Sequence, residues 1–116
     1  MARDLKQNTA VIIAVGPLAA DTDGITLISD ATVTDIDCGI IKAGTAGAAL
    51  TLTSSTGVND MAPVANNPGY YTLELTSSNV NTVGPLRITM NDSDVFVPIW
   101  EDFNVINSAE WTRRYS

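Results

Sequence analysis

Histidine is absent from this sequence, and cysteine occurs once, as Cys38. Histidine is the usual general base and the commonest metal ligand, so its absence excludes imidazole-based triads and most zinc sites. One cysteine forms no disulfide within the chain, and a lone thiol in an apolar run is most often a small buried hydrophobic residue. We therefore expect a protein that is not an enzyme and binds no cofactor, with Cys38 in its core.

The sequence also lacks phosphate-binding motifs and long apolar runs. It contains neither Gly-x-Gly-x-x-Gly nor a Gly-Lys-Ser/Thr loop. The apolar run at residues 10–15 is too short for a secretory signal, and no segment approaches the roughly 20 apolar residues of a membrane span. We expect synthesis and folding in a reducing cytoplasm, with neither a membrane nor a nucleic acid as partner.

Positive charge is scarce and gathers at the two chain ends. The sequence has 13 acidic and 6 basic residues, for a net charge of −7. Lys42 and Arg87 are the only basic residues between residues 21 and 102, and the others are Arg3, Lys6, Arg113 and Arg114. Such an acidic body repels nucleic acid, and it repels other copies of itself unless the basic ends bridge them.

Carboxylates are the remaining candidates for chemistry. Asp35 and Asp37 share a face if their segment is a strand, and Glu101 and Asp102 are adjacent. A glycosidase needs two carboxylates about 5–10 Å apart across a cleft, and a small two-layer β-fold offers little cleft. We therefore interpret these residues as a solvated acidic surface.

Two turns present oxygen atoms that suit calcium. They are Asp21-Thr22-Asp23-Gly24 and Asn91-Asp92-Ser93-Asp94. The EF-hand glutamate is missing after Asp21, and Asp, Asn and Gly are common in turns for backbone reasons alone. Calcium at Asp21–Asp23 or at Asp92–Asp94 stays an open alternative to two ordinary turns.

Apolar and polar side chains alternate along several short runs, as they do in half-buried β-strands. The runs span residues 9–15, 36–42, 70–75, 86–91 and 95–106, with a further candidate at 50–53. Turn-forming residues separate them, and residues 77–82 can make one helical turn. The pattern predicts an all-β fold, either an antiparallel sandwich or a barrel, in which residues 86–91 and 95–106 form a hairpin.

Three aromatic residues fall on faces predicted to point away from the core. Along residues 95–99 the odd-numbered positions form the inward set, which leaves Phe96 and Trp100 outside, and Tyr70 lies opposite Leu73. Pro98 cannot donate to a ladder and therefore favours an edge or a bulge. Tyr70, Phe96 and Trp100 are a candidate patch for a glycan or a protein partner, the alternative being a small cluster under loops.

Residues 107–116 mix aromatic residues with arginines. Ser108 suits a helix N-cap, and Glu110 suits the first turn. Trp, Tyr and Arg are enriched at interface hot spots, although a frayed tail is an equal alternative. Together with the basic N-terminus, the candidate interface residues are Arg3, Lys6, Trp111, Arg113, Arg114 and Tyr115.

Longer motifs add a resemblance that extends over residues 8–106. They are Asp-Gly at 23–24, Ile-Ile-Lys at 40–42, Pro-Gly-Tyr-Tyr-Thr-Leu-Glu-Leu-Thr at 68–76, Asn-Thr-Val-Gly-Pro-Leu-Arg-Ile at 81–88 and Val-Pro-Ile-Trp-Glu-Asp-Phe-Asn-Val at 97–105. Their order and spacing resemble small virion proteins of tailed bacteriophages. The likeness is to immunoglobulin-like modules such as those at the N-termini of baseplate upper and tail-fibre proteins.

This resemblance implies one antiparallel, immunoglobulin-like β-sandwich of about 7–8 strands. The single domain would cover residues 1–116, with a body at residues 8–106 and a short C-terminal extension at 107–116. It further implies a virion structural protein, present in several copies as a capsid decoration, neck, connector or tail subunit that docks on other virion proteins. The alternative function is a carbohydrate-binding module that contacts host glycans through Tyr70, Phe96 or Trp100.

Overall fold

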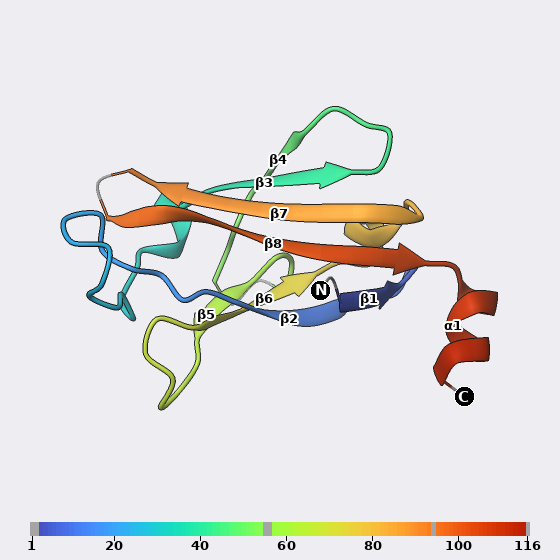
Figure 1. The fold of residues 1–116 in the computed structure, drawn as a ribbon, viewed down its shortest axis with the longest axis horizontal. Helices are drawn as coiled ribbons and strands as arrows, with labels where there is room; N and C mark the ends of the chain where they lie inside the picture. The colour runs from blue at the N-terminus through green and yellow to red at the C-terminus, as the bar shows by residue number, and fades with distance from the viewer. Residues whose placement is uncertain (1–2, 55–56, 94, 116) are drawn as a thin grey trace.

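The chain folds as two β-sheets packed face to face, as seen in a computed structural model that describes residues 3–54, 57–93 and 95–115 (Figure 1). A five-stranded sheet has the order β1-β8-β7-β3-β4, and a three-stranded sheet has the order β2-β6-β5. The strands are β1 (Arg3–Lys6), β2 (Val11–Val15), β3 (Asp37–Lys42), β4 (Ala48–Leu50), β5 (Met61–Pro63), β6 (Tyr71–Leu75), β7 (Gly84–Asp92) and β8 (Phe96–Ile106). The predicted all-β, two-layer architecture is confirmed.

Short helical segments connect or follow these strands. They are the 3-10 turns η1 (Val33–Asp35) and η2 (Ser77–Val80) and the α-helix α1 (Ser108–Tyr115). The turn predicted at residues 77–82 is η2, where Thr76 and Asn79 form a reciprocal capping box. Within the described ranges, no helix has the length and apolar character needed to cross a membrane.

The alternating runs bury one face each, as their period predicts. The inward side chains of β2, β3, β6 and β7 form a mainly aliphatic core between the sheets. Cys38 belongs to this core, and burial raises the pKa of its thiol to about 12, so the predicted role as a small hydrophobic residue is confirmed. Tyr71 is fully buried, and its hydroxyl donates to Ile28 O (2.8 Å) and accepts from Ala31 N–H (3.1 Å). The loop before η1 is therefore anchored to the core.

The predicted hairpin of β7 and β8 is present, and a bulge at Pro98 reverses the faces predicted for Phe96 and Val97, whereas Val95 and Ile99 pack against the core as predicted. Asp92 pairs with Phe96 and Met90 pairs with Ile99, so β8 has one more residue than β7 in this interval. Phe96 is consequently fully buried, and Val97 is exposed. The prediction that Phe96 shares an exposed face with Trp100 is wrong, because the extra residue shifts the alternation.

The N-terminal residues form a strand that the alternation did not indicate. β1 runs parallel to the last part of β8, with Arg3 opposite Phe103 and Lys6 opposite Ile106. Leu5 enters the core from this strand. The sandwich therefore includes Arg3–Lys6, which extends it beyond the body expected at residues 8–106.

Candidate docking surfaces

The C-terminal segment forms α1 directly after β8. Asn107 caps the helix, because its Oδ1 accepts from Glu110 N–H (2.8 Å) and its carbonyl accepts from Trp111 N–H (2.9 Å). Ser108, the predicted cap, is instead the first helical residue. Glu110 lies in the first turn, where a negative charge suits the helix dipole.

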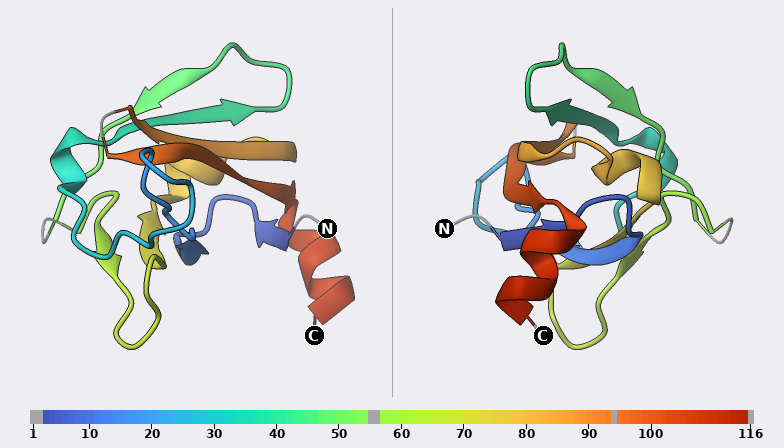
Figure 2. Two further views of the ribbon diagram at one scale, coloured as in Figure 1. Left: turned by 60° about the vertical axis from the view of Figure 1, so that its left-hand side comes forward. Right: turned by 90° about the vertical axis from the view of Figure 1, so that its right-hand side faces the viewer.

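Contacts with Asp4 hold α1 against β1. Arg114 Nη1 and the Tyr115 hydroxyl both donate to Asp4 Oδ2, at 2.9 and 2.8 Å. The hydrogen bond from Tyr115 is the largest cause of a lowered pKa at Asp4, and the bond from Arg114 acts in the same direction. The two chain ends, far apart in sequence, therefore lie side by side at one end of the sandwich (Figure 2).

α1 exposes the ring of Tyr115 and leaves that of Trp111 half-buried. None of its residues is buried, and Trp111 and Tyr115 stack one turn apart with ring centroids 4.3 Å apart. The side chain of Arg113 is 77% exposed and pairs with Glu110. We use the name terminal surface for the candidate interface residues on β1 and α1, which are Arg3, Lys6, Trp111, Arg113, Arg114 and Tyr115. The structure places all of them at one end of the molecule.

The outer face of the five-stranded sheet presents a second surface. Arg87 on β7 makes a two-point ion pair with Asp102 on β8, with N–O distances of 2.7 and 3.0 Å. The Arg87 guanidinium also lies 5.7 Å from the ring centroid of Trp100, whose exposed fraction is 60%. An exposed ion pair adds little stability, and the guanidinium in this position makes a cation–π contact with the exposed Trp100 ring.

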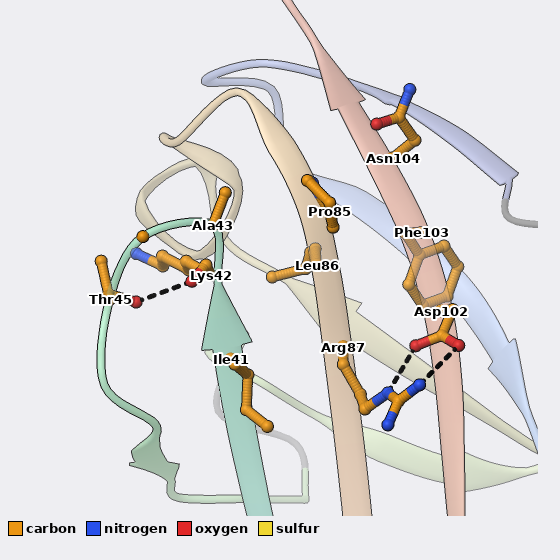
Figure 3. Close-up of a pocket in the computed structure, with 11 residues that line it drawn as sticks. Ile41, Lys42, Ala43, Thr45, Pro85, Leu86, Arg87, Asp102, Phe103 and Asn104 are labelled. Carbon is orange, nitrogen blue, oxygen red and sulfur yellow. Dashed lines mark hydrogen bonds and ion pairs between the residues drawn. The ribbon is translucent and has the colours of Figure 1, made fainter.

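A shallow hollow lies beside this ion pair (Figure 3). Its volume is about 700 Å³, and its walls come from β7, β8 and the turn that follows β3. Thr45 Oγ1 donates to Lys42 O (2.9 Å) and closes that turn, while Ile41 adds an exposed apolar side chain. The hollow could accommodate a ligand or a partner's side chain against a mostly apolar wall, with Arg87 and Asp102 as polar contacts at its border.

The three predicted patch aromatics do not form a common surface. Trp100 lies on the outer face of the five-stranded sheet, whereas Tyr70 precedes β6 in the other sheet. Phe96 lies in the core and is removed from the candidate patch. The neighbours of Trp100, Arg87 and Asp102, were missed because a cross-strand pair depends on register as well as on residue type.

The carboxylate pairs considered in the sequence are separated by the fold. Asp35 lies in η1 and Asp37 begins β3, so the expected shared strand face is wrong. Glu101 and Asp102 occupy opposite faces of β8, and only Asp102 belongs to the outer-face ion pair. Partial burial, followed by the charge of Asp102, raises the pKa of Glu101.

The turn at residues 21–24 uses its own carboxylate for local structure. Asp23 Oδ1 accepts from Ile25 N–H and Thr26 N–H, both at 2.9 Å, and Oδ2 accepts from the Thr26 hydroxyl. The side-chain bond from Thr26 is the largest cause that lowers the pKa of Asp23 to about 2. Asp94, in the other turn, lies outside the described residues. Over the ranges that the structure covers, no group of three or more His, Cys, Asp or Glu side chains is placed to hold a metal ion.

Comparison with known proteins places this chain in no group. No protein-family model matches the sequence, and no curated protein matches it at a significant level.

Proposed function

We propose that this chain is a non-enzymatic structural subunit of a tailed-phage particle that docks on other virion proteins through its terminal surface. The sequence motifs support the phage assignment. The observation that carries the docking role is α1, which buries none of its residues on the sandwich and is nevertheless fixed by Asp4. An eight-residue helix is marginal on its own in water, so a helix held in this way is suited to pack on a partner.

We also propose that the sandwich is immunoglobulin-like. The order β8-β7-β3-β4 corresponds to the sheet G-F-C-C′ of a variable-type domain, and β2-β6-β5 corresponds to B-E-D. The same assignment follows the chain order of the strands from β2 to β8. This correspondence supports the module that the sequence resembles, and it places α1 after the G-like strand and β1 beside it.

Deleting residues 110–116 should remove the protein from assembled particles. The truncated chain should still fold, because the described part of α1 contributes no buried side chain to the core. Mass spectrometry of purified particles measures incorporation, and thermal unfolding of the truncated protein checks the fold.

A matched pair of substitutions separates docking from helix loss. Trp111→Ala removes the larger aromatic ring and should reduce the copies per particle, since truncating a hot-spot residue costs about 2 kcal/mol or more. Thr112→Ala changes an exposed residue in the same helix and should leave the copy number unchanged. Normal particles that carry the truncated or the Trp111→Ala protein would contradict docking through this surface.

A carbohydrate-binding role is the second candidate, and Trp100 favours it. An exposed indole next to an ordered Arg87–Asp102 pair combines a stacking surface with groups that hydrogen-bond sugar hydroxyls. Trp100→Ala should then weaken binding of host-surface polysaccharide by about tenfold, which corresponds to about 1.4 kcal/mol. Calorimetric titration measures this change, with Tyr70→Ala on the other sheet as the control. The absence of binding by the unchanged protein would eliminate the role.

A further inference from the structure

The basic residues of this molecule gather toward one end. Arg3, Phe103, Leu86 and Lys42 lie in one row across the five-stranded sheet, at the end where α1 begins. Lys6 and the arginines of α1 lie at this end as well (Figure 1). Arg87 occupies the next row, opposite Asp102, on the outer sheet face. Asp4, Glu110 and Asp102 also lie toward this end, in ion pairs with its arginines.

Carboxylates gather at the opposite end, which the β7–β8 turn and residues 16–36 form (Figure 1). Asp37 pairs with Asn91 there, and Asp21 N–H donates to Val95 O. The carboxylates are Asp21, Asp23, Asp30, Asp35, Asp37 and Asp92. None of them belongs to an ion pair among the described residues. The longest dimension of the molecule is 45 Å, so the two charged ends are well separated.

The acidic end also exposes apolar side chains. Ile25 is 79%, Leu27 44% and Val97 40% exposed. Ala19 joins two of them, because it bridges to Leu27 and its carbonyl accepts from Val97 N–H (2.8 Å). We call Ile25, Leu27 and Val97 the acidic-end patch. An apolar centre with a charged rim is the usual anatomy of a docking surface.

We infer that the terminal surface of one copy docks on the acidic-end patch of a second copy. The two surfaces match in both respects that matter for recognition. Trp111 and Tyr115 offer an aromatic centre for the apolar patch. Arg113 and Arg114 already pair with Glu110 and Asp4, so Arg3 and Lys6, which make no ion pair among the described residues, supply the charge that faces the carboxylates around Ile25. This inference rests on the proposed function in treating the terminal surface as a docking site, and it names the partner.

Opposite ends in contact give a particular kind of assembly. The two surfaces differ and lie at opposite ends, so the contact is heterologous and a pair of copies leaves one free surface of each kind for a third copy. The product is a row of copies, or a ring if each step includes a suitable rotation. A subunit with such a contact is suited to form a repeating layer or collar on a particle.

Salt should affect this contact in two directions. The net charge of −7 makes copies repel one another at long range, but the Debye length is about 10 Å at 0.1 M salt, so distant charges are screened there. The attraction between the two ends in contact then outweighs the repulsion between distant charges. Near 1 M salt the Debye length falls to about 3 Å, and the attraction between the ends is screened as well. Association should therefore be stronger near 0.1 M salt than near 1 M.

Sedimentation velocity of the purified full chain tests the inference. At about 0.1 M salt we expect association that grows with protein concentration up to about 1 mM, a range that detects even weak contacts. Trp111→Ala and Ile25→Ser should each weaken it by about tenfold or more. Ile12→Ser, at an exposed apolar residue on β2, is the matched control and should associate like the unchanged protein.

Mixing the two variants gives the sharpest result. The Trp111→Ala protein keeps an intact acidic end, and the Ile25→Ser protein keeps an intact terminal surface. One good contact remains between them, so the mixture should form heterodimers and stop there, whereas each variant alone associates with the weakened affinity. A symmetric contact between identical surfaces would not be restored by mixing, and that result would overturn the inference.

The remaining outcomes separate this inference from the proposed function. An unchanged protein that stays monomeric up to about 1 mM overturns the inference. If the unchanged protein is monomeric and the chain lacking residues 110–116 is missing from particles, the proposed docking through the terminal surface still holds. The partner is then a different virion protein. If the unchanged protein forms rows but the truncated chain enters particles normally, self-association holds and the proposed docking route fails.

Discussion

Replacing Phe96 with alanine should lower the free energy of unfolding by about 3–5 kcal/mol, the range for truncating a buried phenylalanine. Phe96 is fully buried beside the bulge of β8. It also bridges to Ala20, so the cavity would open where the acidic-end loop joins the sheet. Denaturant unfolding at equilibrium measures the change, with an unchanged slope indicating that the transition is still two-state.

Val97→Ala is the control for this experiment. Val97 is the next residue on the same strand and is exposed, so its loss should cost about 0.5 kcal/mol or less. The alternation in the sequence predicts the opposite order, with Val97 inside and Phe96 outside. A larger loss for Val97→Ala than for Phe96→Ala would therefore refute the bulge at Pro98.

Substituting Gly16 with alanine should be similarly damaging, with an expected loss of about 2–6 kcal/mol from backbone strain and overpacking together. Gly16 has a φ of 122°, and a Cβ added there would lie 2.6 Å from Gly69 O. That carbonyl accepts from Leu18 N–H (2.9 Å), so it cannot withdraw without losing a hydrogen bond. Thermal or denaturant unfolding measures the loss.

Gly24→Ala isolates the backbone-strain part of this effect, so the difference between the two losses measures the overpacking. Gly24 also has a positive φ, of 67°, but an added Cβ would meet nothing within 4 Å. Its substitution should cost about 1–2 kcal/mol, the strain of a left-handed backbone alone. Equal losses at the two positions would mean that the loop of residues 64–70 yields easily and does not hold the Gly16 turn in place.

Phe96→Ala and Gly16→Ala both change the acidic end, so they should also affect the proposed assembly. Phe96 and Gly16 support the loop that carries the acidic-end patch, whereas α1 projects from the opposite end (Figure 2). Damage to the core near Phe96 should therefore weaken docking at the acidic end and leave the terminal surface intact. The mixing experiment distinguishes these two surfaces in the same way.

Local pattern alone determined most of the strands of this protein. Alternation placed Ile13, Cys38, Leu73 and Ile88 in the core, and each of them is buried. The turn residues between β7 and β8 indicated a hairpin. The absence of histidine favoured a binding role over a catalytic one. These features are readable because a pleated strand encodes its buried face every second residue.

Tertiary structure decided where the surfaces lie. The parallel pairing of β1 with β8 joins residues about 100 positions apart, and nothing local in Arg3–Lys6 specifies it. The same pairing allows Asp4 to form an ion pair with Arg114, so the two chain ends meet. The sequence indicated that each end is basic but not that the two ends lie together. Pro98 signalled a bulge, but the burial of Phe96 depended on which side gained the residue. Strand pairing and register decide which face of a sheet a side chain occupies and which elements meet at each end of the sandwich. A shift of one residue in register moves a side chain to the opposite face.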